Sequence, residues 1–485
     1  MNRKITLNIN GVVGNIRNGS DVGVPQGSAL SPILFRIFVM DLAAELTNRG
    51  DISILKFADD GTIRVTSNST PACLETLQHI LTTVNLWTYK WRMVINCQPN
   101  KTEVIGFSTA EGDRSLIPDT FKLGEATINR VPQTKVLGLV LDENLSFTEH
   151  SKEVYKKLVR LWAMISQHSN RHWGFNKATM VQIIKTLFLP TLLYAGHIWI
   201  NQHNMKEINS LYYKILKSTV GAVLNIRQTY AEVILGLPPI NIVNEINKVK
   251  HYLKVNMTKL PEDRLRDLIQ REIENNPRSQ VYHSIRLVFK YLKWKLHNYP
   301  DSVDDSDTVI IDSGNIEEFF NISPETCKYT KGNIVKYTEY MWKRSVQNEL
   351  QQEGYSGIPE PKCSSMPTSI GLKRQEEVMV MSMFYPNNTL NSFLHTINSE
   401  KFPTPTCHCG ESSQTAHHVL FNCSTVDEAL RLEAYSLLQQ VVGDQEAEIE
   451  NHLVLMKARN SKTLMNVISE IVIQQMNHLN VNIDL

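Results

Sequence analysis

The spacing of apolar residues changes once along the chain, near residue 150. Before this point, short runs that alternate between apolar and polar residues predict strands joined by tight turns, with two longer runs at helical spacing between them. From residue 151 the apolar positions recur at helical spacing to about residue 259. We therefore predict an α+β fold, in which a mixed part, 1–150, is followed by a helical part, 151–260.

The mixed part is predicted to begin with a hairpin over residues 5–17, because Asn10-Gly11 separates two alternating runs. A helix is expected next, with Ser31 as its N-cap and Pro32 as its first residue. The remaining predicted elements are a hairpin that turns at Asp60-Gly61, a helix over 71–93, a short strand at Ile95 and Asn96, and strands over 102–107 and 136–142.

The helical part is predicted to contain helices over 151–168, 176–200 and 204–220, a helix capped by Thr229 and Glu232, and a last helix to about residue 259. The helix over 176–200 is expected to break near Pro190. After the helical part we expect a poorly patterned helical or linker region, 261–400, a cysteine-rich segment, 401–426, and a helical tail, 427–485.

The composition narrows the class of protein. A chain of 485 residues is too long for one ordinary core, and 42% hydrophobic with 20% charged residues is typical of soluble globular proteins. The most apolar window, 183–200, is interrupted by Lys185, Pro190 and His197, so no membrane span is expected. Seven dispersed cysteines indicate reduced thiols, and hence the nucleus or the cytoplasm.

The charge is unevenly distributed. Residues 151–260 carry fifteen Lys and Arg against four Asp and Glu, a local charge of +11, although the net charge of the chain is +1. Lys152, Lys156, Lys157 and Arg160 recur at helical spacing, which suits a nucleic-acid backbone as well as an ordinary solvated helix face. The interspersed tryptophans are more often core residues than stacking platforms.

Asp59 and Asp60 are the first candidate for chemistry, because two adjacent carboxylates cannot both be buried without partners. They are either solvated at a turn or they hold a cation. The pair alone does not distinguish these alternatives.

The neighbouring motifs favour the second alternative, in which Asp59 and Asp60 hold a cation. The segment 24–32, Val-Pro-Gln-Gly-Ser-Ala-Leu-Ser-Pro, followed by Phe57-Ala58-Asp59-Asp60, resembles the palm of a reverse transcriptase of the non-LTR retrotransposon type. Later pieces agree in order with this family: Asn96 with the Asn-Lys-Thr-Glu segment 100–103, Leu137-Gly138 with Asp142 and His150, and the Gly-Leu-Pro-Pro segment 236–239. The resemblance covers about residues 5–245 and implies a partial palm followed by a helical thumb.

The resemblance implies roles for particular residues. Asp59, with Asp60 beside it, would hold the two Mg²⁺ ions of nucleotidyl transfer, and Lys101 would lie near the triphosphate. The segment Pro25, Gln26, Gly27 and Ser28 would line the nucleotide and template side, and Leu137 and Gly138 would belong to the hairpin that grips the primer end. The implied partners are an RNA template, a DNA primer or target, and dNTPs.

The sequence also departs from the family. An earlier strand with the first metal-binding Asp, and the fingers before it, should precede the 5–17 hairpin, and Asp21 and Asp41 stand in the wrong context to replace it. We therefore expect a truncated reverse transcriptase that is weak or inactive as an isolated chain. A non-catalytic nucleic-acid-binding remnant and a group II intron maturase-like protein are the alternatives.

A second constellation lies near the C-terminus. Cys407, Cys409 and Cys423, with a histidine between them, give the pattern C-x-C-x8-H-x4-C, which offers a closed ligand set for structural Zn²⁺. His417 and His418 compete for the fourth place, and the x4 spacing favours His418. The motif resembles the Cys-Cys-His-Cys knuckle of the same family and would help to hold RNA or DNA.

Overall fold

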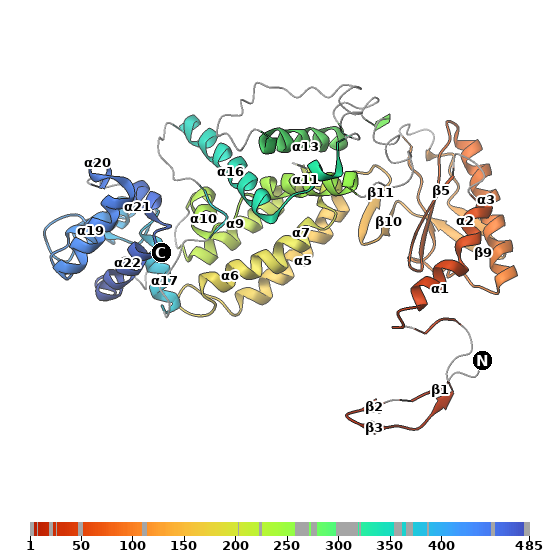
Figure 1. Ribbon diagram of the computed structural model, residues 1–485, viewed down its shortest axis with the longest axis horizontal. Coiled ribbons are helices and arrows are strands. Elements are labelled where there is room, and N and C mark those ends of the chain that lie inside the picture. The colour runs from red at the N-terminus through yellow and green to blue at the C-terminus, as the bar shows by residue number, and fades with distance from the viewer. Residues whose placement is uncertain are drawn as a thin grey trace. The chain divides into compact units, whose positions relative to one another are not determined.

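The structure is a computed structural model that describes residues 4–6, 8–18, 23–25, 27–46, 52–108, 114–201, 203–222, 226–257, 271–272, 279–296, 319, 322–353, 361–364, 372–385, 388–447 and 452–479. The chain divides into two compact units, Met1–His150 and Ser151–Leu485 (Figure 1). Helices and small sheets occur together in the first unit, and the described part of the second is almost entirely helical, so the fold is α+β.

The first unit holds the strands, which form five small sheets within the described residues. Four of these are antiparallel pairs, β1–β4, β2–β3, β5–β6 and β10–β11, and the fifth has the order β7-β9-β8. The strands are β1 (Lys4–Ile5), β2 (Asn8–Ile9), β3 (Val12–Val13), β4 (Arg17–Asn18), β5 (Ile52–Phe57), β6 (Asp60–Val65), β7 (Glu103–Val104), β8 (Thr120–Leu123), β9 (Ala126–Arg130), β10 (Gln133–Val136) and β11 (Leu139–Asp142).

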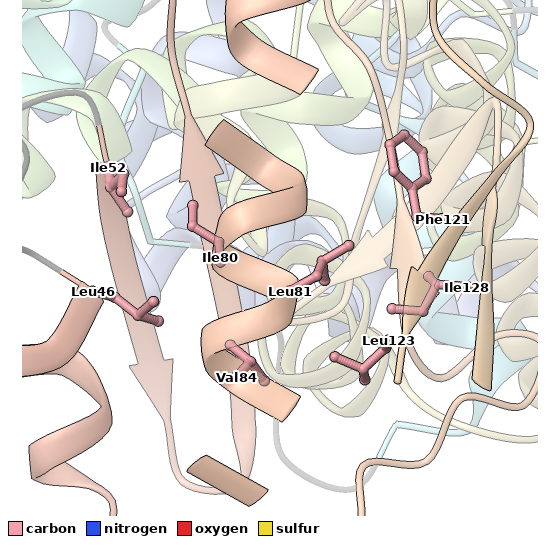
Figure 2. Close-up of a cluster of buried hydrophobic side chains, with 8 residues drawn as sticks. All are labelled: Leu46, Ile52, Ile80, Leu81, Val84, Phe121, Leu123 and Ile128. Carbon is pink, nitrogen blue, oxygen red and sulfur yellow. The ribbon is translucent and has the colours of Figure 1, made fainter. Parts of the chain in front are cut away.

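The described residues of this unit include the helices α1 (Ser31–Phe38), α2 (Met40–Leu46) and α3 (Thr70–Trp91). The long helix α3 buries Ile80, Leu81, Val84, Trp87 and Thr88, a spacing that keeps one stripe of an α-helix facing the core. Figure 2 shows three residues of this stripe, Ile80, Leu81 and Val84. In this view Leu46 and Ile52 lie on one side of the helix, and Phe121, Leu123 and Ile128 lie on the other. The core of the unit is thus built around α3.

The predicted hairpin near the N-terminus is confirmed. Asn8 pairs with Val13 and Ile9 with Val12, so Asn10 and Gly11 form a two-residue turn. Both turn residues have positive φ, 51° and 86°, which is the conformation for which Asn-Gly is preferred. Leu7 lies outside the described residues.

One predicted strand is wrong, and two others are shorter or interrupted. Ile95 and Asn96 lie in an irregular segment, and the strand expected over 102–107 is only β7. The strand expected over 136–142 is interrupted, because Leu137 and Gly138 turn the chain and separate β10 from β11. Apolar alternation over a few residues does not specify a strand unless a partner strand is available to pair with it.

The next helices are those that the structure describes in the second unit. They are α5 (Thr148–Ser166), which begins before the boundary of the unit, α6 (Lys177–Ile183), η1 (Ile184–Phe188), α7 (Leu189–Leu193), α8 (Gly196–Trp199), η2 (His203–Met205), α9 (Lys206–Val220), α10 (Gln228–Leu235), α11 (Ile240–Met257), α13 (Gln280–Leu296), α15 (Pro324–Cys327), α16 (Lys331–Glu353), α17 (Arg374–Ser382), α18 (Asn391–Ile397), η3 (His418–Asn422), α19 (Glu428–Val442), α20 (Asp444–Ala447), α21 (His452–Ala458) and α22 (Lys462–Gln475).

Two details of the predicted helices are wrong. The chain forms a π-turn, η1, before Pro190 and continues as helix to Leu193, so the expected break falls instead at Ala195, which has a positive φ of 50°. Helix α10 begins at Gln228, with Arg227 as N-cap and no capping side chain, so Thr229 and Glu232 do not form the predicted capping box.

Side chains distant in the sequence hold the second unit together. Helix α11 lies beside α13 and also contacts α16, and α22 packs on α17 and α19 (Figure 1). A buried ion pair joins Arg374 and Glu377, with Nη1 3.0 Å from Oε2. Glu377 also accepts a hydrogen bond from the backbone N–H of Lys177, and Arg374 donates to the carbonyl of Thr219, so the start of α17 is fixed to α6 and to the end of α9.

None of the helices in the described residues combines the length and apolar character needed to cross a membrane.

Candidate functional sites

The β5–β6 hairpin presents the two adjacent aspartates. Phe57 pairs with Asp60, so the turn consists of Ala58 and Asp59, and Gly61 pairs with Lys56 inside the strand. The predicted turn at Asp60-Gly61 is therefore wrong by two residues. Ala58 takes the positive φ, 53°, a left-handed conformation that costs an alanine about 1 kcal/mol. Asp59 lies at the tip of the hairpin and Asp60 is the first residue of β6, and both are exposed.

Strand β5 contributes a cationic side chain, Lys56, near the tip of the hairpin. Lys56 Nζ donates a hydrogen bond to the carbonyl of Val39, between α1 and α2. Burial lowers the pKa of Lys56, although the nearby Asp41 carboxylate opposes this effect. Asp41 Oδ1 accepts a hydrogen bond from Trp87 Nε1 at 2.9 Å, so this carboxylate joins α2 to α3.

The segment before α1 is organised by Ser31. Its hydroxyl donates to the carbonyl of Pro25 at 2.5 Å, and its backbone N–H donates to the carbonyl of Ser28 at 3.2 Å. Ser31 is therefore the first residue of α1 rather than its N-cap, which corrects the prediction. Pro25, Gly27 and Ser28 are exposed, and Gln26 lies outside the described residues.

Lys101 stands on a loop that its neighbours hold in place. Asn100 has a positive φ of 65°, and its N–H donates to Glu103 Oε1 at 2.9 Å. The Thr102 hydroxyl donates to the carbonyl of Asn96 at 2.9 Å, which closes the loop. Lys101 itself is exposed to solvent.

Leu137 and Gly138 form the turn of the β10–β11 hairpin. Val136 pairs with Leu139 across it, and the two turn residues have positive φ, 47° and 85°. This conformation is rare for a leucine, and Leu137 exposes 48% of its surface. The hairpin named by the resemblance is therefore present, although the predicted continuous strand is not.

The segment after this hairpin is fixed by Asp142 and His150. The Asp142 carboxylate accepts hydrogen bonds from the backbone N–H groups of Asn144, Ser146 and Phe147. Burial pushes the pKa of Asp142 upward, but these hydrogen bonds outweigh it, so the pKa lies below its ordinary value. His150 Nδ1 accepts from the N–H of Val140 at 3.2 Å.

The Cys/His cluster, defined as Cys407, Cys409, His418 and Cys423, is a compact ligand set. Its four candidate ligand atoms all lie within 4.8 Å of one another, and among the described residues it is the one such group of three or more His, Cys, Asp or Glu side chains. Cys407 Sγ lies 3.8 Å from Cys423 Sγ, which equals the edge of about 3.8 Å that a tetrahedral zinc site with Zn–S bonds of about 2.3 Å requires. Cys409 Sγ lies 3.2 Å from His418 Nε2.

Local backbone structure accounts for this convergence. A bridge between Thr406 and Ser413 closes the loop that carries Cys407 and Cys409. The other two members of the cluster, His418 and Cys423, lie at the two ends of the π-turn η3, whose hydrogen bonds join residues five apart. The N–H of Cys423 donates to the carbonyl of His418 at 2.8 Å. The x4 spacing therefore places His418 and Cys423 on the same side of one π-turn.

The two neighbouring histidines have different environments. His418 reaches into the cluster, whereas His417 Nε2 lies 3.1 Å from the carbonyl of Ala447 and its Nδ1 lies 3.4 Å from Asn422 Nδ2. His417 is thus engaged in packing α20 against the cluster, and the geometry favours His418 as the fourth ligand.

The thiols differ in their electrostatics. Burial raises the pKa of Cys407 to about 12. Burial also acts to raise the pKa of Cys409, but hydrogen bonds from the backbone at Glu411 and from Cys407 and Cys423 outweigh it and lower this pKa. A divalent cation would lower the pKa of every thiol that it contacts, because the thiolate is the metal ligand.

The basic face predicted on residues 151–168 lies on α5. Lys152, Lys156, Lys157 and Arg160 are exposed, while Val154 and Leu158 on the other face are buried. Of the nearby tryptophans, Trp199 is fully buried and Trp173 exposes 55% of its surface, so one is a core residue and the other is accessible for stacking.

Sequence comparison places these features among known proteins. Residues 7–141 match the family described as reverse transcriptase (RNA-dependent DNA polymerase). The chain is 27% identical over 250 residues to an RNA-directed DNA polymerase from the mobile element jockey of Drosophila funebris, an alignment that covers 48% of this chain and 25% of the relative. It is 27% identical over 219 residues to a probable RNA-directed DNA polymerase from transposon BS of Drosophila melanogaster, covering 43% of this chain and 23% of the relative.

A third relative aligns over most of its length. The Pol polyprotein from the type-1 retrotransposable element R1 2 of Nasonia vitripennis is 21% identical over 425 residues, which cover 87% of this chain and 90% of the relative. The chain spans about a quarter of the length of the jockey and BS relatives. No solved structure matches the chain.

Proposed function

Because the chain carries a reverse transcriptase domain of the non-LTR retrotransposon type in residues 7–141, we propose that it derives from an enzyme that copies RNA into DNA during retrotransposition. The observation that carries this proposal is the β5–β6 hairpin, which lies inside the matched residues and presents Asp59 and Asp60 to solvent. The nucleic-acid partners proposed are an RNA template and a DNA primer or target, with dNTPs as substrates.

The carboxylates at the hairpin tip have the chemistry that Mg²⁺ prefers. Asp59 would be a direct ligand and Asp60 would stand beside it, since both offer hard oxygen atoms. Bound Mg²⁺ supplies charge neutralisation and in-line alignment of the reacting oxygens. Lys101 would approach the triphosphate, and the segment Pro25, Gln26, Gly27 and Ser28 would line the nucleotide and template side. The turn formed by Leu137 and Gly138 would contact the primer end.

The carboxylate set is small for a two-metal site. Among the described residues, no third Asp or Glu joins Asp59 and Asp60 in a group that could hold an ion. Asp41 is engaged with Trp87. Because transition-state stabilisation depends on the complete ligand set, we propose that the isolated chain polymerises weakly or not at all.

Primer extension on an RNA template tests the catalytic proposal. The wild-type chain is compared with Asp59→Asn/Asp60→Asn and with Asp119→Asn, an exposed aspartate of the same unit, at several Mg²⁺ concentrations. Any extension should be lost in the double variant and kept in the control. Equal signals from the wild type and the double variant would overturn catalysis by this chain.

A second candidate function is nucleic-acid binding without catalysis. The exposed basic face of α5 and the exposed Trp173 favour it, because cationic side chains follow a phosphate backbone and an exposed aromatic ring can stack on a base. This function does not depend on Asp59 or Asp60, so the double variant should retain it.

The Cys/His cluster would hold a structural Zn²⁺. Three thiolates and one imidazole within 4.8 Å form a closed four-ligand set, and bound zinc would cross-link the two segments that supply them. We place the protein in the nucleus or the cytoplasm, where such thiols remain reduced.

A further inference from the structure

The hydroxyl of Thr425 lies at the meeting point of three polar side chains beside the Cys/His cluster. Its Oγ1 is 3.0 Å from Cys423 Sγ, 2.8 Å from His408 Nε2 and 3.4 Å from Gln475 Oε1. These partners come from a metal-ligand position, from the loop between Cys407 and Cys409, and from the end of α22. The hydroxyl therefore lies against three separate segments, and of its partners Gln475 Oε1 can only accept a hydrogen bond.

A hydroxyl has one proton to donate and two lone pairs with which to accept, so its three contacts cannot all be of the same kind. Cys423 must lose its proton to bind a metal, and a thiolate is a stronger acceptor than an amide or hydroxyl oxygen because of its charge. With metal bound, the Thr425 proton is therefore directed to Cys423 Sγ. His408, as the Nε2–H tautomer, then donates to Thr425 Oγ1, and its Nδ1 carries no proton for Cys407 Sγ, 3.4 Å away. Gln475 Oε1 can only accept, so it makes no hydrogen bond to this hydroxyl, and Gln475 holds Thr425 through its Nε2 and the Thr425 carbonyl.

We propose that Thr425 is a positioning residue of the metal site, which orients the Cys423 thiolate through its hydroxyl. Its hydroxyl is held by His408 and its backbone carbonyl by Gln475 Nε2. This inference rests on the proposed binding of zinc by the Cys/His cluster. Hydrogen bonds from outside the ligand set fix the orientation of metal ligands and tune the charge on them.

The same contacts connect the metal site to α22. Gln475 is 2% exposed, and its Nε2 donates to the carbonyl of Thr425 at 3.3 Å. On the other side, the fully buried Gln414 donates from Nε2 to the carbonyl of His478 at 3.3 Å, and the His408 and His478 rings stack with centroids 3.9 Å apart. Because coupling between two equilibria is reciprocal, the metal should stabilise α22, and α22 should raise the affinity for the metal.

Zinc affinity, measured by competition with a chelator, tests the proposal in the full chain. Thr425→Val keeps the shape of the side chain and removes the hydroxyl, whereas Thr425→Ser keeps the hydroxyl. We expect Thr425→Val to bind zinc about 10-fold to 100-fold more weakly, and Thr425→Ser to bind it nearly as well as the wild type. His408→Phe, which retains a ring to stack on His478, should weaken binding by a smaller factor.

A spectroscopic measurement separates positioning from a general loss of structure. With Co²⁺ in place of zinc, loss of the hydrogen bond to Cys423 should move the thiolate-to-cobalt absorption band of Thr425→Val to lower energy, and Thr425→Ser should restore it. If the wild type binds zinc but Thr425→Val shows the same affinity and the same band, the positioning role is overturned while the zinc site stands. If the wild type binds no zinc, the zinc site and the role of Thr425 are both overturned. If Thr425→Val does not fold, an unchanged zinc affinity in His408→Phe overturns the chain of hydrogen bonds from His408 through Thr425 to Cys423.

Discussion

Thr134 donates a hydrogen bond from Oγ1 to Glu103 Oε2 at 2.8 Å, across 31 residues of sequence. The other carboxylate oxygen of Glu103 accepts from the N–H of Asn100. Glu103 thus fixes the loop that carries Lys101 to strand β10, the strand that leads into the Leu137–Gly138 turn.

Replacing Glu103 should loosen this loop. Glu103→Ala removes both acceptors, and we expect it to lower the free energy of unfolding by about 1–3 kcal/mol, since each lost hydrogen bond contributes about 0.5–1.5 kcal/mol. Hydrogen exchange at the Asn100 amide should accelerate. Glu103→Gln, which retains one oxygen acceptor, should have the smaller effect, and unchanged exchange in Glu103→Ala would show that Glu103 does not hold the loop.

Local rules predicted those parts of the first unit whose structure is decided locally. Asn10-Gly11 forms its hairpin because its two residues alone favour positive φ. The turn of the second hairpin was misplaced because its position depends on how β5 and β6 pair, with Phe57 opposite Asp60. Asp-Gly is a good turn sequence, but the strand register overrides it and leaves Ala58 in the strained conformation.

The four side chains of the Cys/His cluster could be predicted from the sequence, whereas the side chains around them could not. The spacing of the three cysteines and a histidine names the candidate ligands, and the structure brings their ligand atoms within 4.8 Å of one another. Thr425 and Gln475 lie 50 residues apart, and neither belongs to a motif. Side chains that support a site from other elements follow from the tertiary fold, which local spacing does not describe.

The two adjacent histidines allow a matched test of the ligand set. His418→Gln removes the ligand nitrogen, so we expect zinc content to fall well below one ion per chain. His417→Gln should retain its zinc, because His417 contacts Ala447 and Asn422 instead, and should cost only about 0.5–1.5 kcal/mol of stability. Metal analysis of the purified variants measures both outcomes, and zinc lost from His417→Gln but kept by His418→Gln would reverse the assignment.

Acid should destabilise the second unit through His197. Burial, together with His251 and Lys248, lowers the pKa of His197 to about 4, and its ring stacks on His251 with centroids 3.8 Å apart. In the unfolded chain His197 is protonated as the pH falls below about 6.5, whereas in the folded chain it is protonated only near pH 4. Stability from this group is therefore fully present above pH 6.5 and declines as the pH falls towards 4.

Urea unfolding at pH 7.5 and pH 4.5 measures this decline. His197→Phe keeps an aromatic ring and cannot take up a proton, so its midpoint should fall less between the two pH values than that of the wild type. His251 also has a lowered pKa from burial, and His251→Phe should reduce the decline in the same direction. An equal decline in His197→Phe and the wild type would exclude His197 as the source.

The basic face of α5 should bind nucleic acid through phosphates and hence in a salt-dependent manner. Lys156, Lys157 and Arg160 are exposed on one helix whose other face is buried in the second unit. Replacing Lys156 and Lys157 by Ala should weaken binding to an RNA–DNA hybrid and reduce the slope of log affinity against log salt by about one for each lysine that contacts a phosphate. Lys462→Ala, which removes an exposed lysine at the start of α22, serves as the control and should change neither quantity. Because a stacking or hydrophobic contact does not release counterions, weaker binding with an unchanged slope would show that α5 does not act through the phosphate backbone.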